Sequence, residues 1–527
     1  MSRRRALAGI GAGGAVLAQP AAHALTQESP MSTDSRLTRT LTTAALKGMP
    51  DLRAGDWVET TGFHIPGDGG EGLYQIREAG ADETPDGASV LPLADGLAAE
   101  LVEAEAVNYR MFGATEDGTR DDGAAIKAAH AWANVHRVPV VQRSGEFWIR
   151  DTHGIEIRTG VDWGRSVFHI DERHNSKAEP RFVVRNDRPA VDVPLDAELK
   201  SALLEKIRPG VQLIPELAPY AGHLISVADE GDRIGIRAGN YSKRGWAREE
   251  LFYVEEEGRI LGDIAWAFSD FTSVRATPCN DNVLVIRGGT FYFSGDSPQN
   301  SSPGYHHHGI LIERSRTVVR DQWMGLEPGH SDNSMEPRRG CYILSGVYDV
   351  TLENIRCMPW EKNREGKGRD VAHGTYGIGG ARMLNCTFRN LTAEAGWVSW
   401  GVFGTNLNKN FRVENCRLNR IDVHFHCWNL TIRDCTIGFK GISVTGGGDL
   451  LIENTVRHGT SFVNFRSDYG SRWDGRIRLR GLRHPRDARA GELWIGGPAP
   501  RLTDWIGFGR CVGDEVTWGG EASRGEK

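Results

Sequence analysis

The sequence lacks the features that mark membrane, nucleic-acid-binding and zinc-binding proteins. Its one sustained apolar run, at residues 6–18, is too short and too glycine-rich to span a bilayer. A formal net charge of −6 gives no general attraction to nucleic acid or to an anionic membrane. The eight cysteines include no Cys-x-x-Cys pair, which argues against a zinc site. We therefore expect no nucleic-acid or membrane partner, and a polyanionic substrate would have to be attracted by a local basic cleft.

Residues 1–24 have the pattern of an export signal. The basic segment at 2–5 (SRRR) precedes the apolar run, and an Ala-x-Ala cleavage site follows at 22–24. Serine and paired arginines before a weakly apolar run resemble a twin-arginine signal, with an ordinary secretory signal as the alternative. We expect an exported protein, periplasmic or extracellular, in which some cysteines could form a disulfide.

Short strands recur through the second half of the chain. Residues 411–416 (FRVENC), 430–435 (LTIRDC), 450–455 (LLIENT) and 477–481 (IRLRG) alternate apolar and polar side chains and recur after about twenty residues. Asn410, Asn429 and Asp449 precede three of them at matching places. Such a repeat without intervening helices predicts a solenoid. We interpret it as an all-β, single-stranded right-handed parallel β-helix, with Asn, Asp and Gly in left-handed corners and Cys416 and Cys435 stacked inside.

Residues 108–130 (NYRMFGATEDGTRDDGAAIKAAH) predict a strand, a turn and a short amphipathic helix capped by Asp121 or Asp122. Such a helix can cover the open end of a solenoid. The segment resembles the corresponding stretch of the pectin-lyase-like β-helix superfamily, to which polygalacturonases, polysaccharide lyases and phage tailspike depolymerases belong. The resemblance implies the fold and does not specify the reaction.

The predicted organisation has four parts. They are the export signal (1–24), a linker with a small β region (25–105), the β-helix (106–490) with an insertion around 162–277 where the repeat breaks, and a C-terminal cap and tail (491–527).

Stacking consecutive rungs from Asn410, Asn429 and Asp449 predicts a polar patch on one outer surface. Ile421, Val423 and Phe425 would point inward, and the alternate residues outward, because side chains switch faces at each step of a strand. Neighbouring rungs lie about 4.8 Å apart, so the outward groups would share one ledge. The candidate catalytic residues are His424, His426, Asp422, Arg466, Asp468 and Tyr469. The candidate substrate-binding residues are Asn406, Lys409, Arg420, Trp400, Trp473, Asn464 and His373.

Histidine, arginine, tyrosine and carboxylates on a rigid surface suit acid–base chemistry on an extended polymer. We expect a lyase that cleaves a uronic-acid-containing polysaccharide by β-elimination. His424 would be the base and Tyr469 the acid or an alternative base. Arg466, with Asn406 or His426, would neutralise the substrate carboxylate, and Asp422 and Asp468 would orient their neighbours.

Two alternatives stay open. An inverting glycoside hydrolase would use Asp422 and Asp468 as its carboxylate pair, although the signatures of polygalacturonases are missing in their expected order. A non-catalytic glycan-binding solenoid would depend on tryptophans such as Trp400 and Trp473. We expect no metal site and no required cofactor, with calcium as an alternative. The resemblance implies either a monomer or a homotrimer.

Overall fold

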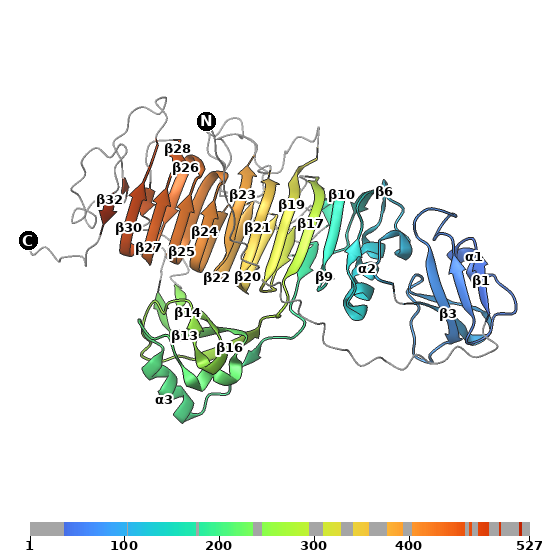
Figure 1. Cartoon of the computed structure of the whole chain (residues 1–527), viewed down its shortest axis with the longest axis horizontal. Helices are drawn as coiled ribbons and strands as arrows, with labels where there is room; N and C mark the ends of the chain where they lie inside the picture. The colour runs from blue at the N-terminus through green and yellow to red at the C-terminus, as the bar shows by residue number, and fades with distance from the viewer. Residues whose placement is uncertain are drawn as a thin grey trace, which may run out of the picture.

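The computed structural model describes residues 36–102, 104–174, 179–234, 245–294, 309–327, 341–357, 377–393, 403–458, 463–465, 473–483, 495–496 and 516–518. Three units are present in these ranges: a small sheet at the N-terminal end, a long coil of strands, and an antiparallel domain that branches from the coil (Figure 1). The coil gives one sheet of 22 described strands, in which nearly all pairings are parallel. The predicted all-β parallel β-helix is therefore confirmed.

The coil begins with β6 (Asp117–Asp121). Later strands pair with the strands that occupy the matching places in the next turn of the coil. The early strands are β7 (Val140–Val141), β8 (Glu146–Ile149), β9 (Ile155–Ile157), β10 (Val161–Ile170), β11 (Phe182–Val184), β17 (Leu284–Phe293), β18 (Ile310–Ile312) and β19 (Thr317–Leu326). The middle strands are β20 (Tyr342–Tyr348), β21 (Val350–Cys357), β22 (Ile378–Leu384), β23 (Thr387–Ala393), β24 (Phe403–Glu414) and β25 (Arg417–Arg433). The last are β26 (Thr436–Val444), β27 (Gly446–Glu453), β28 (Val456–Arg457), β29 (Val463–Phe465), β30 (Trp473–Arg480), β31 (Ile495–Gly496) and β32 (Val516–Trp518).

The coil has three faces, each defined by its strand register. The first face aligns residues 284–287, 317–320, 350–353, 387–389, 411–414, 430–433, 450–453 and 477–480. The second aligns 146–149, 167–170, 290–293 and 323–326, and continues through 355–357. The third aligns 182–184, 310–312, 342–344, 378–380, 403–405, 421–423, 442–444 and 463–465. Inward side chains of all three faces form one continuous apolar core, which includes Cys416 and Cys435.

Outward residues of the first face form a ladder of alternating charge. Arg320, Glu353, Arg389, Glu414, Arg433, Glu453 and Arg480 occupy successive rungs at one position. Arg389 bonds Glu353 at 2.6 Å, and Arg433 bonds Glu453 at 2.7 Å. Opposite charges at neighbouring positions of a sheet stabilise one another, so this face is built to hold the coil together.

An asparagine ladder fixes one corner of the coil. Asn410 donates from Nδ2 to Asn385 at 2.8 Å, and Asn429 donates to Asn410 at 2.9 Å. Both donors have positive φ, as the sequence predicts. The prediction for Asp449 is wrong, because Gly448 takes the left-handed conformation on that rung. The backbone N–H of Asp449 then bonds Oδ1 of Asn429 at 2.8 Å and continues the ladder.

The N-terminal sheet comprises β1 (Leu37–Thr40), β2 (Trp57–Thr60), β3 (Gly72–Glu78), β4 (Val90–Pro92) and β5 (Leu97–Leu101), with α1 (Thr43–Lys47). Helix α2 (Gly123–His136) lies between this sheet and the coil (Figure 1). Its apolar side chains Ile126, Ala129 and Ala133 are buried in the core of the coil. This confirms the predicted capping helix. Asp122 is the N-cap residue, although its side chain bonds Thr115 and the Asp121 carboxylate accepts the Gly123 N–H.

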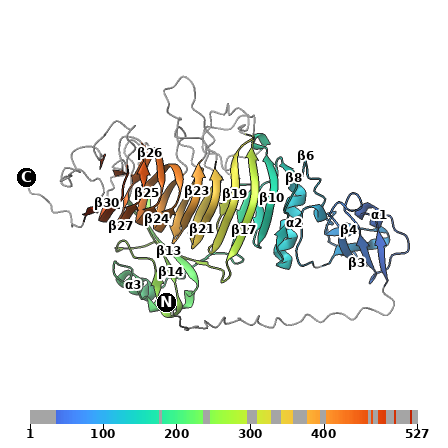
Figure 2. The same cartoon turned by 45° about the horizontal axis from the view of Figure 1, so that its top comes forward.

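The antiparallel domain, called the insertion below, leaves the coil after β11 and returns before β17. It contains β12 (Val191–Asp192), α3 (Ala197–Lys206), β13 (His223–Ile234), β14 (Trp246–Val254), β15 (Ile260–Leu261) and β16 (Ser273–Pro278). It begins later than the predicted 162, because β10 and β11 pair with strands of the coil. The domain lies beside the middle rungs, on one side of the coil (Figure 2).

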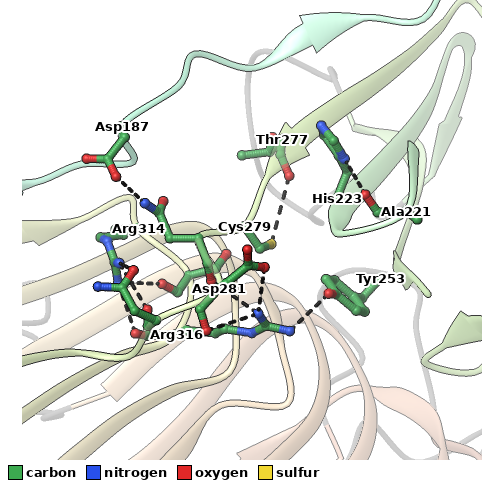
Figure 3. Close-up of polar contacts among 12 residues, drawn as sticks. Asp187, Ala221, His223, Tyr253, Thr277, Cys279, Asp281, Arg314 and Arg316 are labelled. Atoms are coloured by element: carbon green, nitrogen blue, oxygen red, sulfur yellow. Dashed lines mark hydrogen bonds and ion pairs between the residues drawn. The ribbon is translucent and has the colours of Figure 1, made fainter. Parts of the chain in front are cut away.

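Arg316 of the coil anchors the base of the insertion. Its guanidinium donates to the hydroxyl of Tyr253 at 3.0 Å and lies 3.7 Å from the Asp281 carboxylate (Figure 3). The Tyr253 ring in turn stacks on Tyr348 of the coil, with centroids 4.3 Å apart. Nearby, the buried Arg314 donates to the backbone and side-chain oxygens of Asn282. The insertion is thus held through specific polar and ring contacts.

Candidate functional site

The third face carries the polar rungs on which the sequence places the site. Ile421, Ile442 and Val463 are aligned on successive rungs and buried in the core. Their neighbours Asp422, Ser443 and Asn464 are aligned on the outer side. Asn464 Nδ2 donates to Ser443 Oγ at 3.5 Å. The predicted stacking register is therefore correct for these three rungs.

Asp422 lies on this face and is paired with Arg420. Arg420 Nη2 lies 2.7 Å from Asp422 Oδ2, and the Asp422 side chain is fully buried while that of Arg420 is 11 % exposed. The sequence pattern predicts that outward residues face solvent, and this prediction is wrong for Asp422. An outward position on a strand does not by itself ensure exposure. A buried carboxylate needs a charged or hydrogen-bonding partner, which Arg420 supplies.

A β-bulge occurs in β25 at His424. Gly404 and Thr405 pair with Asp422 and Val423, but the next residue, Asn406, pairs with Phe425. His424 is therefore the extra residue in its strand. Bulges bend a strand, re-aim side chains and are enriched beside active sites. The side chains of His424 and Asn406 lie outside the described part of the structure.

Beyond the bulge the alternation of side chains changes. Phe425, predicted to point inward, instead stacks on Trp246 of the insertion with ring centroids 6.1 Å apart and planes 5° apart. His426 adopts a left-handed backbone conformation with φ 43°. Cys427 is again in the core. Two backbone irregularities thus turn a short segment toward the insertion, which a regular alternation could not predict.

His426 and Lys409 do not belong to a solvent-facing patch. The His426 ring is buried against Trp266 of the insertion, with centroids 4.2 Å apart. Burial, with smaller contributions from Lys409 and Arg248, lowers the pKa of His426 to about 3. Lys409 is fully buried in an ion pair with Glu250. A neutral histidine and a paired lysine cannot neutralise a substrate carboxylate, so the predicted roles of both residues are wrong.

Trp473 is also misplaced by the prediction. It is 2 % exposed and belongs to the core of the coil, with its indole N–H donating to the Gly448 carbonyl at 3.2 Å. It therefore offers no ring face to a sugar. The remaining candidates Trp400, His373, Arg466, Asp468 and Tyr469 lie outside the described residues.

A small hollow that the sequence analysis missed lies between the insertion and the coil. Trp246 and Trp266 from the insertion face Leu407 and Phe425 from the coil across it. At its edge, Arg382 of the coil makes two hydrogen bonds to Glu249 of the insertion, at 2.6 and 2.7 Å. Trp246 and Trp266 stand in the segment where the repeat breaks, so no strand register links them to Leu407 or Phe425. Their partners are set by docking of the insertion.

No helix in the described residues is long and apolar enough to cross a membrane. Within the same residues, no group of three His, Cys, Asp or Glu side chains is placed to hold a metal ion. The seven cysteines in the described ranges are free thiols and buried.

Comparison with known proteins gives one curated relative and several structural neighbours. The chain is 26 % identical over 261 residues to a protein of Klebsiella phage P510 described as a depolymerase specific for capsule KL64. The match covers 47 % of this chain and 24 % of that protein, so the chain spans about a quarter of the relative's length. No family model matches the sequence.

Two of the structural neighbours are tailspikes of Pseudomonas phages. The LKA1 tailspike gp49 aligns with 15 % identity and a TM-score of 0.43, covering 71 % of this chain and 64 % of the tailspike. The phi297 tailspike gp61 aligns with 12 % identity and a TM-score of 0.40, covering 73 % of this chain and 76 % of the tailspike.

Proposed function

We propose that the protein is an enzyme that depolymerises a polysaccharide at the third face, around Asp422 and His424. The observation that carries this proposal is the bulge at His424, two residues from the buried Asp422–Arg420 ion pair. A strand irregularity beside a buried charge pair is an arrangement that active sites often use. The partial likeness to a phage capsule depolymerase supports a capsular polysaccharide as the first substrate to test.

The finer proposal is cleavage by β-elimination. A base removes the C5 proton of a uronic acid, the electrons of that bond form the C4–C5 double bond, and the C4–O bond breaks. The substrate carboxylate must be neutralised and the leaving oxygen protonated. We assign the base to His424 and the acid to Tyr469. Arg466 and Asn406 neutralise the carboxylate.

The environment of Asp422 favours this reaction over hydrolysis by an Asp422–Asp468 pair. Asp422 is fully buried and forms an ion pair with Arg420 at 2.7 Å. A carboxylate in that position is suited to hold the guanidinium and the strand end rather than to protonate a glycosidic oxygen. We propose that Arg420, which is 11 % exposed, assists in binding an acidic sugar.

We further propose that residues 1–24 direct export and that cleavage needs no metal. Adding a chelator to the reaction tests the metal, and calcium dependence would appear as loss of cleavage. Light scattering distinguishes the monomer from the homotrimer.

Substitution of His424 tests the site. The assay measures new reducing ends released from KL64 capsular polysaccharide and from alginate, a polyuronate. We expect His424→Ala to lower kcat by roughly 10²- to 10⁴-fold, the usual contribution of a general base. Asp422→Asn should also lower it. Arg433→Ala, on the first face, is the matched control and should leave kcat unchanged. Full activity of a folded His424→Ala variant would overturn the assignment.

A further inference from the structure

A row of ring side chains lies on the outer side of the second face, near the N-terminal end of the coil. The strand register aligns Trp148, His169 and Tyr292 on three successive rungs. On the fourth rung the partner of Tyr292 is Gly325, and Trp323 packs against Tyr292 instead, with centroids 5.1 Å apart. All four rings are half-buried. With rungs about 4.8 Å apart, the row extends over about 14 Å.

Two glutamates bind the histidine in this row. Glu146 Oε1 lies 2.7 Å from Nε2 of His169, and Glu327 Oε1 lies 2.9 Å from Nδ1. One carboxylate thus faces each ring nitrogen of His169. The two contacts fix the ring. The glutamate side chains are 57 % and 39 % exposed, so each still presents carboxylate oxygen to solvent.

The charge ladder of the first face offers a comparison, because its outward side chains stabilise the coil through ion pairs. One column of its outward positions alternates arginine and glutamate from Arg320 to Arg480, with ion pairs such as Arg389–Glu353 between neighbouring rungs. The ring row has no such alternation. It places partly exposed aromatic surface outside the coil, where a stabilising role would favour charge pairs. Tyrosine and tryptophan in such positions are typical of binding surfaces.

We propose that Trp148, His169, Tyr292 and Trp323, together with Glu146 and Glu327, bind a neutral, hydroxyl-rich stretch of polysaccharide a few sugar rings long. The rings pack on the apolar faces of the sugars. The two carboxylates accept hydrogen bonds from sugar hydroxyls and repel uronates. This ring row lies on a different face from His424 and needs no cleavage. It rests on the proposed function only in taking a polysaccharide as the ligand.

Affinity electrophoresis tests the proposal, with the full chain run in native gels that contain dextran, galactomannan or alginate. We expect at least one of the two neutral polysaccharides to retard the protein. The Tyr292→Ala/Trp323→Ala variant should weaken that retardation by about tenfold in affinity. Trp57→Ala is the matched control, because Trp57 is a half-buried tryptophan of the N-terminal sheet, and it should migrate as the unsubstituted chain does.

A second variant keeps the test decisive if the aromatic substitutions prevent folding. Glu146→Ala/Glu327→Ala removes two partly exposed carboxylates and should weaken retardation severalfold. Equal retardation of this variant and the unsubstituted chain, no retardation by either neutral polysaccharide, or retardation by alginate alone would overturn the proposal. His424→Ala should bind as before. Binding of a neutral polysaccharide by a chain that cleaves neither KL64 capsular polysaccharide nor alginate would count against the proposed function and leave the ring row in place.

Discussion

Lys409 of the coil and Glu250 of the insertion form an ion pair in which both side chains are fully buried, with Nζ 2.5 Å from Oε1. The Glu250 carboxylate also accepts the backbone N–H groups of Leu251 and Ala265. Lys409 donates in addition to the Asp263 carbonyl. Both charges are thus satisfied where the two units meet, and loss of one partner would leave the other charge buried and unpaired.

Substitution of one partner should be costly. Glu250→Gln leaves the buried ammonium of Lys409 without a counter-charge, which costs about 3–5 kcal/mol for a pair of this kind. We expect a large fall in the melting temperature and faster proteolysis of the insertion. Lys409→Met/Glu250→Leu removes both charges and should recover most of the loss. A melting temperature unchanged by Glu250→Gln would show that the insertion is held by other contacts.

Acid should weaken the same junction through His426. Its pKa falls to about 3 in the folded protein, mainly through burial, from an ordinary value of about 6.5. The folded state therefore binds fewer protons than the unfolded chain between these values. The contribution of His426 to stability is complete above about pH 6.5 and is lost as the pH falls toward 3.

Melting temperatures measured between neutral and mildly acidic pH check whether stability falls with pH as expected. His426→Gln cannot take up the proton, so its melting temperature should fall less steeply with acid than that of the unsubstituted protein. Part of the dependence of the melting temperature on pH should persist in this variant, because burial also lowers the pKa of His130 to about 3. Parallel curves for the two proteins would contradict the assignment.

Reversing one charge in the ladder of the first face should lower the free energy of unfolding by a small amount that depends on salt. Arg433→Glu places three glutamates on successive rungs, with Glu414 on one side and Glu453 on the other. We expect a loss of about 0.5–2 kcal/mol from two reversed neighbouring pairs. Raising the salt concentration should reduce the loss, because exposed charges are screened. A loss that does not change with salt would point to packing rather than charge.

Asn410 allows backbone conformation and hydrogen bonding to be separated. Its φ is 52°, and its side chain bonds both Asn385 and Asn429. Asn410→Gly keeps the left-handed conformation and loses the ladder, whereas Asn410→Ala loses both. The alanine variant should therefore be less stable than the glycine variant by about 1 kcal/mol in denaturant unfolding. Equal stability would mean that conformation contributes little at this corner.

The architecture could be predicted because each rung repeats the same local rules. Alternating side chains, asparagine corners such as Asn410 and Asn429, and the helix at 123–136 all depend on residues near one another in the sequence. Asp449 was assigned the wrong conformation because a glycine precedes it, and glycine adopts positive φ at lower cost.

The site could be predicted only in part. Asp422, Ser443 and Asn464 align as expected, because their rungs are regular. Lys409, His426 and Phe425 were misplaced because the insertion covers them, a contact between residues far apart in the chain. The bulge at His424 also has no clear sequence signal.

The chemistry of cleavage at the third face is tested most directly by ultraviolet absorbance during digestion of a uronic-acid-containing polysaccharide. β-Elimination leaves a C4–C5 double bond conjugated with the uronate carboxyl, whereas hydrolysis leaves none. We predict that absorbance and new reducing ends rise together with the unsubstituted protein, and that neither rises with His424→Ala. Reducing ends that form without absorbance would contradict the lyase mechanism, and unchanged cleavage by His424→Ala would contradict the site.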